Sequence, residues 1–315
     1  MQAYIVRRIV YGLVVMWAVA TLVFFAMRAV PGDPVRALVG LDADPATVAE
    51  IRRTMGLDRP FVVQYGWWLG RVLRGDLGHS IWVKQPVATL VREALPRTLS
   101  LACLSFLVAV ALAVPAGIVS AVRRRSAADH ALTVLAFLGL SMPSFWLGIV
   151  LIIVFAVQLR VFPAFGYEPL AVGVWPWLSH LILPAIATGT PFAAIVARMT
   201  RAALLDVLQE DYVRTARAKG LRERVVINRH ALANALIPVI TVMGIAFALL
   251  LAGAVISENV FAIKGVGRLV IEGILNRDFP IVQGAIIVIA GIFVFTNIVV
   301  DVLYALVNPK IRYSG

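Results

Sequence analysis

Charged residues and cysteines are both scarce in this sequence. Only 15% of its 315 residues are charged and 61% are hydrophobic, whereas soluble globular domains carry roughly 25% charged residues. The single cysteine, Cys103, allows no disulfide within the chain, which excludes a disulfide-stabilised secreted module. A water-soluble protein and a disordered chain are excluded as well, because neither is this apolar. The composition therefore indicates a protein embedded in a lipid bilayer.

The sequence also lacks the motifs of common catalytic and nucleotide-binding sites. It has no Gly-x-x-x-x-Gly-Lys-Ser/Thr phosphate loop, no His-Glu-x-x-His and no Gly-x-Ser-x-Gly. Its histidines and cysteine do not have the spacing of a metal site. Two carboxylates in or beside apolar stretches, Glu258 and Asp301, are interpreted as helix-end caps or local ion pairs. We therefore expect a protein that is not an enzyme and that binds no metal or cofactor of its own.

Charge-free apolar runs long enough to cross a membrane are present instead. A membrane-spanning helix needs about 20 apolar residues, and the sequence predicts an all-α polytopic membrane protein with six such helices. The first run is too long for the hydrophobic region of a cleaved signal peptide, so we expect it to be retained. The predicted spans are residues 9–27, 98–122, 131–159, a span from about 179 to 197, 231–257 and 279–300.

Positive charge is distributed unevenly among the loops between these spans. The chain has 29 Lys and Arg against 17 Asp and Glu, a net charge of +12. In a soluble chain this excess would indicate nucleic acid, but in a membrane protein it indicates cytoplasmic loops. Loops on one side hold 15 basic residues and the short loops opposite hold four, Arg160, Lys264, Arg268 and Arg277. We therefore expect both termini in the cytoplasm and no nucleic acid partner.

The long segment between the first two predicted spans, residues 28–97, then lies on the outer side. It is rich in turn signals, for example at residues 31–34 and 75–78. Residues 46–55 predict a short helix closed by Gly56, and residues 61–73 predict an amphipathic helix. Three tryptophans in this segment, Trp67, Trp68 and Trp82, are suited to a membrane interface.

Polar and helix-breaking residues fall inside the third and fourth predicted spans. Proline removes a backbone donor and clashes with the preceding turn, and such breaks in membrane helices are tolerated against protein or a water-filled path. This favours transport, although prolines are also simply common in membrane helices. The candidate path residues are Ser141, Pro143, Ser144, Thr188, Thr190 and Pro191.

The loop between the fourth and fifth predicted spans contains one short helix, residues 212–219. Asp211 is expected to be its N-cap and Gly220 its C-terminal stop. A helix this short is unstable alone, so it must pack on something. Its two alanines would let a partner surface approach closely, and its basic residues suit a complementary groove. A basic loop bound to anionic lipid headgroups explains the periodicity equally well. The residues concerned are Ala216, Ala218, Arg214, Arg217 and Lys219.

Residues 214–221 and 234–238 resemble the coupling loop of ABC importer permeases of the dipeptide/oligopeptide/nickel class. Where many ABC importers have Glu and Ala, this chain has Arg214 and Thr215, and Pro238 follows Gly220 by 18 residues, as in the peptide-type branch. One external loop departs from the family, with Lys264 in place of the usual proline. Further similar motifs, in order, are residues 31–35, 56–60, 75–78, 210–212, 253–255, 265–269, 277–280, 300–304 and 308–313.

This resemblance implies a type I ABC importer permease fold in a bacterial inner membrane. In that family the complex contains a second homologous permease, two cytoplasmic ATPases that bind ATP and Mg²⁺, and an extracytoplasmic substrate-binding protein. Residues 30–97 would either help to receive the binding protein or only cover helix ends. The residues implied to couple to an ATPase are Asp211, Tyr212, Arg214, Thr215, Ala216, Arg217, Ala218, Lys219 and Gly220.

Several readings of function stay open at this point. Dipeptides and oligopeptides are the commonest cargo of the resembled family, and nickel chelates, glutathione and opines are alternatives. A stand-alone secondary transporter or channel is a different class, but it would usually show inverted repeats or intramembrane acidic residues. A membrane scaffold for a soluble enzyme is a third class. The expected organisation is residues 1–29, 30–97, 98–307 with a coupling loop at 203–232, and a tail at 308–315.

Overall fold

The computed structural model describes residues 2–29, 44–54 and 56–307. These residues form helices and loops, and their strand-type pairing is limited to one isolated bridge between His79 and Pro86. Two of the motifs noted above, residues 31–35 and 308–313, lie outside the described residues, as does the expected tail at 308–315.

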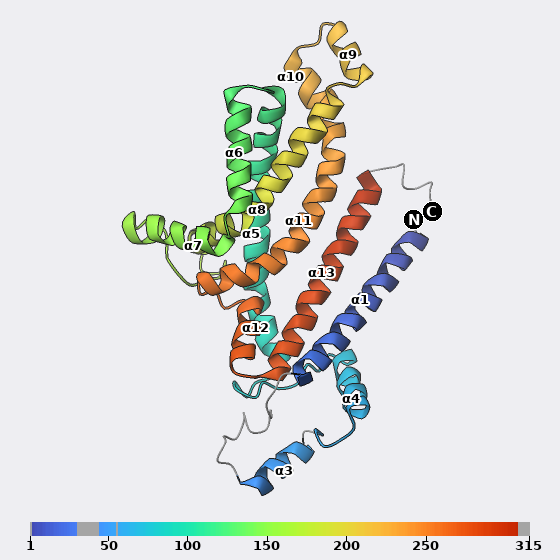
Figure 1. Ribbon diagram of the computed structural model, residues 1–315, viewed down its shortest axis with the longest axis vertical. Helices are drawn as coiled ribbons and strands as arrows, with labels where there is room; N and C mark the ends of the chain where they lie inside the picture. The colour runs from blue at the N-terminus through green and yellow to red at the C-terminus, as the bar shows by residue number, and fades with distance from the viewer. Residues whose placement is uncertain (1, 30–43, 55, 308–315) are drawn as a thin grey trace. The chain divides into compact units, whose positions relative to one another are not determined.

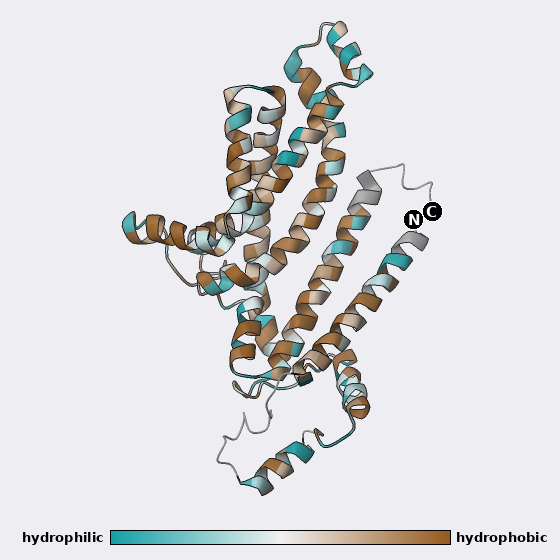
Figure 2. Cartoon of the chain, in the orientation of Figure 1, coloured by the Kyte–Doolittle hydropathy of each residue, from teal (hydrophilic) through white to brown (hydrophobic). Residues whose placement is uncertain are grey.

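Long apolar helices make up most of the chain (Figure 1). Within the part of the chain that the structure describes, five are long and apolar enough to cross a membrane, and a bent helix pair makes six if it is counted as one span. The expected all-α polytopic architecture is therefore confirmed. Their middle sections are mostly hydrophobic (Figure 2). The helices concerned are α1 (Gln2–Ala29), α5 (Val87–Val122), α8 (Val174–Val207), α11 (Leu232–Val260), α13 (Phe279–Val307) and the bent pair α6 (Ala127–Ser141) and α7 (Ser144–Leu151), which continues as the π-helix η1 (Ile152–Gln158).

The third predicted span is not continuous, which corrects the expected run at residues 131–159. Its two halves are bent by 104° at a short break. Pro143 precedes α7, and Met142 before it is extended, with ψ 123°. The cause is steric, because the proline ring disfavours the helical conformation in the preceding residue. Pro143 therefore ends one helix and starts another.

Two other helix boundaries differ from expectation. α8 begins at Val174 rather than near residue 179, because Pro176 falls in its first turn, where a missing N–H costs no hydrogen bond. α8 also runs through Pro184 and Pro191 without interruption, so of the two predicted breaks only that at Pro143 is present. α5 begins at Val87, 11 residues before the expected start of the second span at Thr98.

The chain forms two compact units, each described here by itself. The larger unit comprises Met1–Ile9, Thr98–Ile263 and Phe295–Gly315. In it α8 packs against α6, α7 and α11, and fully buried leucines such as Leu181, Leu204 and Leu250 belong to its core. Gly189 allows a close approach between α8 and α5, since a Cβ there would lie 2.6 Å from the Ser105 carbonyl oxygen.

The smaller unit comprises Val10–Arg97 and Lys264–Val294. It contains the helices α3 (Pro45–Thr54), α4 (Phe61–Leu73) and α12 (Val266–Leu275), and the first two match the helices expected in the external segment. Phe24 of α1 packs against Tyr65 and Trp68 of α4. The expected division at residues 29, 97 and 307 stays a prediction, and the units place residues 264–294 with residues 10–97.

Asp278 organises one end of the smaller unit. Its carboxylate accepts hydrogen bonds from the Ser80 hydroxyl (2.6 Å) and from the Trp82 N–H (2.9 Å). The other carboxylate oxygen accepts from the Ile281 N–H in the first turn of α13, so Asp278 caps this helix. The loop around residues 78–82 is therefore fixed against the beginning of α13.

Candidate functional site

The short helix α9 (Asp211–Ala218) follows α8 after three residues. In this link the N–H groups of Leu208, Gln209 and Glu210 all donate to backbone carbonyls of the last turn of α8. Figure 1 shows α9 beside α10 (Glu223–Val225) at the end of the larger unit where α8 ends and α11 begins. Such a tight link fixes the direction of α9 relative to α8.

One face of α9 is buried in the larger unit. Val213 is fully buried and Ala216 is 6% exposed, one helical turn apart on the same face. Both belong to a cluster that includes Leu204 of α8 and Val226 of η2 (Val226–Ala231). This packing supplies the stability that eight residues lack alone. It also corrects one expectation: Ala216 packs inside this chain and is not available for close approach by a partner.

Two polar contacts anchor α9 to the segment that follows it. The Asn234 amide of α11 donates to the Tyr212 hydroxyl at 2.8 Å. The Arg217 guanidinium donates to both carboxylate oxygens of Glu223, at 2.7 and 3.1 Å, and this pairing raises the pKa of Arg217. The sequence did not identify Asn234 or Glu223 as partners of α9, although Asn234 lies within a motif that resembles the family.

The expected ends of α9 differ in one detail. Asp211 is its first helical residue, and the flanking residue is Glu210, which makes no side-chain capping hydrogen bond. The predicted N-cap role of Asp211 is therefore wrong. At the other end the predicted stop is confirmed, because Gly220 has φ +77°, a left-handed conformation that favours glycine. Among the described residues other than its two chain neighbours, no heavy atom lies within 4 Å of a Cβ built at Gly220.

The remaining surface of α9 is exposed. Arg214 makes one weak contact, at 3.4 Å to Asp211, and the two side chains are 69% and 96% exposed. Tyr212 is 41% exposed, and the other exposed residues are Thr215, Arg217, Ala218, Lys219 and Gly220. Figure 2 shows this end of the unit as predominantly hydrophilic. α9 therefore presents a polar, mainly basic face while its apolar face is fixed to the fold.

The candidate path residues on α8 have satisfied hydroxyl groups. The buried Thr188 hydroxyl donates to the Pro184 carbonyl at 2.7 Å and accepts a hydrogen bond from the Ser257 hydroxyl at 2.5 Å. Thr190 donates to the Ile186 carbonyl at 2.7 Å, and Pro191 follows it at a partly buried position. The proline-rich middle of α8 is thus stabilised by its own threonines and by α11.

The candidate path residues on the bent pair lie at its corner. Ser141 ends α6, Pro143 precedes α7 and Ser144 begins it. Ser141 and Pro143 are exposed and Ser144 is partly buried. Close by in the sequence, a Cβ at Gly139 would lie 3.1 Å from Thr190, so α6 and α8 approach closely here. Whether these six residues line a path stays a prediction.

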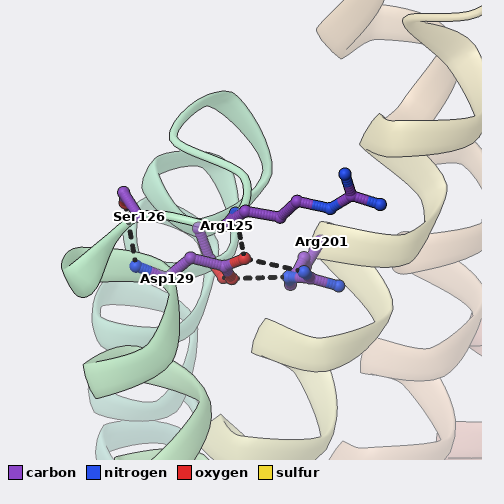
Figure 3. A network of polar contacts seen from close by, with 5 residues as sticks. Arg125, Ser126, Asp129 and Arg201 are labelled. Carbon is purple, nitrogen blue, oxygen red and sulfur yellow. Dashed lines mark hydrogen bonds and ion pairs between the residues drawn. The ribbon is translucent and has the colours of Figure 1, made fainter.

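A polar network centred on an ion pair joins three helices of the larger unit, and the sequence did not predict it. Asp129 of α6 is buried, and both its carboxylate oxygens accept from Arg201 of α8, at 2.8 and 2.9 Å. The same carboxylate accepts from the Ser120 hydroxyl of α5 and from the Arg125 N–H. Ser126 caps α6 by accepting from the Asp129 N–H (Figure 3). The residues around Asp129 and around Arg201 form no motif that would predict this ion pair, which is visible only in the folded structure.

Two further polar contacts concern the carboxylates near span ends. Asp301 of α13 pairs with Arg8 of α1 at 3.1 Å, which confirms its interpretation as part of a local ion pair. Glu258 is fully buried and accepts a hydrogen bond from Thr98 at 2.5 Å. This bond links α11 to α5 within the larger unit.

Comparison with known proteins identifies the chain's relatives. The family model described as "Binding-protein-dependent transport system inner membrane component" matches residues 113–313, and the model of its N-terminal part matches residues 1–102. A Brucella abortus (strain 2308) protein, named as a peptide transport system permease, is 44% identical over the full length of both chains. The glutathione transport system permease protein of Pectobacterium atrosepticum is 42% identical over the full length of both. The dipeptide transport system permease protein of Alkalihalophilus pseudofirmus is 38% identical, over 99% of this chain and 100% of that protein. The chain therefore belongs to the family of inner membrane components of binding-protein-dependent transport systems.

Proposed function

We propose that this chain is one permease subunit of an ATP-driven importer for dipeptides or oligopeptides. It would form half of the translocation path, with a second, homologous permease forming the other half. Two cytoplasmic ATPases would bind ATP and Mg²⁺, and an extracytoplasmic protein would deliver the substrate. The relatives named for peptides, dipeptides and glutathione support this substrate range, and glutathione, nickel chelates and opines are the alternative cargos.

The main support for this proposal is that α9 has one face buried in the fold and the opposite face exposed. Its apolar side is held by Val213 and Ala216, while Arg214 and Lys219 on its polar side are exposed. An element held firmly on one side and presented on the other suits docking into a groove of a partner protein. We propose that this partner is the ATPase, with α9 seated in a cleft on its surface.

The anchoring contacts suggest how the force is transmitted. The three-residue link joins α9 to α8, and the Tyr212–Asn234 hydrogen bond joins it to α11. When ATP closes the ATPase pair, α9 would move as a rigid lever and carry both long helices with it. The subunit would then alternate between inward-facing and outward-facing states, a population shift driven by ATP.

The proposed orientation follows from the same argument. Both termini and α9 lie in the cytoplasm, where the basic loops are expected, and residues 30–97 lie outside. The excess of 15 basic residues over four supports this orientation. It also brings α9 to the only side on which a cytoplasmic ATPase can reach it.

Charge reversal on the exposed face tests the proposal. Arg214→Glu with Lys219→Glu should release the ATPases during purification of the complex and lower ATP-driven peptide uptake into proteoliposomes by at least about tenfold. The matched control is Arg123→Glu with Arg124→Glu, two exposed basic residues in the loop between α5 and α6, which should keep both. Equal uptake in the two double variants would refute docking through α9. Uptake by the purified chain alone, driven by an ion gradient, would support a secondary transporter instead.

A further inference from the structure

A large open cavity in the smaller unit is lined by an unusual number of arginines. Its volume is about 1300 Å³. Its lining includes a histidine, His79, but contains no Asp, Glu or Lys among the described residues. The arginines are Arg28, Arg52, Arg53, Arg59, Arg71 and Arg74.

Five of these arginines, all except Arg52, have no ion pair with a carboxylate of the described residues. Arg28 donates to the Gln64 amide oxygen at 3.0 and 3.1 Å and lies 3.6 Å from the centre of the Phe24 ring. Arg59 lies 3.9 Å from the centre of the Trp67 ring. None of these partners carries a negative charge, and the described residues provide no ion pair to Arg53, Arg71 or Arg74. Several like charges around one cavity repel one another, so an anionic ligand would be favoured there.

The cavity lies at the ends of two membrane spans. Its lining includes Met27 and Arg28 at the end of α1, and Phe279 and Pro280 at the beginning of α13. The span Val6–Ala29 has 24 residues, which is about 36 Å of helix, whereas the hydrocarbon core is roughly 30 Å thick. The last residues of the span therefore reach the level of the lipid headgroups.

The aromatic side chains that line the cavity are also suited to the level of the lipid headgroups. Phe61 and Trp67 of α4 line it and are 62% and 58% exposed. Tryptophan is enriched where hydrocarbon meets headgroups. α4 is an amphipathic helix, and amphipathic helices that carry tryptophan and arginine can lie in the membrane interface. Arginine binds phosphate through two parallel hydrogen bonds. The cavity therefore combines aromatic side chains suited to the membrane interface with arginines suited to binding phosphate.

We propose that this cavity binds the anionic phosphodiester headgroup of a membrane phospholipid. The lipid would hold α4 near the ends of α1 and α13 by neutralising the positive charge of the arginines that line the cavity. This inference depends on the membrane spans and goes beyond the proposed coupling to an ATPase.

Binding of a tail-labelled phosphatidylglycerol to the purified full-length complex tests the proposal. The wild-type complex should bind this lipid more tightly than tail-labelled phosphatidylcholine. Arg71→Gln with Arg74→Gln should weaken phosphatidylglycerol binding by about tenfold or more, since each basic residue at an anionic membrane surface contributes roughly 1 kcal/mol. Arg71→Lys with Arg74→Lys should lose less affinity than the double glutamine variant, because the charge is kept and only the planar fork is lost.

The matched control removes two charges from the same unit outside the cavity. Arg92→Gln with Lys264→Gln changes exposed residues that are not in the lining, and this variant should bind phosphatidylglycerol as the wild type does. Equal loss in both double glutamine variants would overturn the assignment. Inorganic phosphate that binds as well as the lipid would also overturn it, in favour of a soluble anion. Unchanged lipid binding in Arg71→Gln/Arg74→Gln, with weaker association of the extracytoplasmic binding protein, would overturn it in favour of an acidic protein surface.

Discussion

The Asp129 carboxylate and the Arg201 guanidinium form a two-pronged ion pair that joins α6 to α8. The Asp129 side chain is 5% exposed and that of Arg201 is 33% exposed. Because a link of three residues joins α8 to α9, this pair ties the α5–α6 hairpin to the helix that carries the proposed coupling element. The Ser120 hydroxyl and the Arg125 N–H complete the environment of the carboxylate.

Removing the arginine should destabilise the larger unit. Arg201→Ala leaves the buried Asp129 carboxylate without its cation, which typically costs about 3 kcal/mol or more. Arg198→Ala is the matched control on the same helix. The exposed Arg198 lies 5.0 Å from the centre of the Phe137 ring and has no ion pair with a described residue, so its loss should cost about 1 kcal/mol or less. Thermal unfolding of the purified chain in detergent compares the two. Identical unfolding midpoints would show that the ion pair does not stabilise the fold.

Two helical glycines of the larger unit should respond differently to alanine. At Gly189 a new Cβ would meet the Ser105 carbonyl oxygen at 2.6 Å, a backbone atom that cannot move aside easily. Gly189→Ala should therefore lower the unfolding temperature by forcing α8 away from α5. At Gly253 the nearest atom would be 3.7 Å away, so Gly253→Ala should be neutral or stabilising by up to about 1 kcal/mol. A stable Gly189→Ala variant would contradict the close approach of α5 and α8.

Substitutions of Gly220, which has a left-handed backbone conformation, test backbone strain without the added effect of steric clashes. With no atoms near the added Cβ, a substitution there acts through φ alone. An L-residue in this conformation costs roughly 1–2 kcal/mol, and valine costs more because it is β-branched. Gly220→Val should remain in the membrane but lose ATP-driven uptake, while Gly220→Asn should retain much of it, because asparagine tolerates this conformation. Immunoblots of membranes and uptake assays measure the two properties. Normal uptake by Gly220→Val would contradict the claim that transport requires the left-handed backbone conformation at the end of α9.

The orientation in the membrane can be measured with single cysteines. Replacing Cys103 by serine gives a cysteine-free chain, into which Ala218→Cys and Lys264→Cys are introduced separately at exposed positions. In membranes that contain the chain without ATPases, a membrane-impermeant thiol reagent should label the Ala218→Cys variant only in inside-out vesicles and the Lys264→Cys variant only in intact spheroplasts. Labelling of both variants from the same side would contradict the orientation derived from the basic loops.

Much of the fold could be predicted because lipid imposes a simple requirement. A long apolar stretch in a bilayer must satisfy its backbone internally, so it becomes a helix, and six such stretches were visible. The helices α3 and α4, between the first two spans, were also predictable, since Gly56 and the apolar pattern of residues 61–73 mark their limits. The sharp bend at Pro143 was not predicted. Hydropathy is averaged over many residues, so it does not register a break that one proline causes in the residue before it.

The candidate site was predictable only in part. The length of α9 and its glycine stop follow from local sequence, so Gly220 was placed correctly. Which alanine faces inward depends on how α9 packs on η2, and hence Ala216 was assigned to the wrong surface. Asp129 and Arg201 are 72 residues apart, and nothing in either local sequence predicts their pairing.

The most direct test of the account is the protection of α9 by the ATPase. In the cysteine-free background, the thiol of the Ala218→Cys variant should react with a soluble thiol reagent at least about tenfold more slowly in the assembled complex than in the chain without ATPases, because the docked partner excludes the reagent. A cysteine replacing the exposed Arg124 should react at the same rate in both. Equal rates for the Ala218→Cys variant with and without the ATPases would contradict the claim that α9 is the surface through which ATP drives this permease.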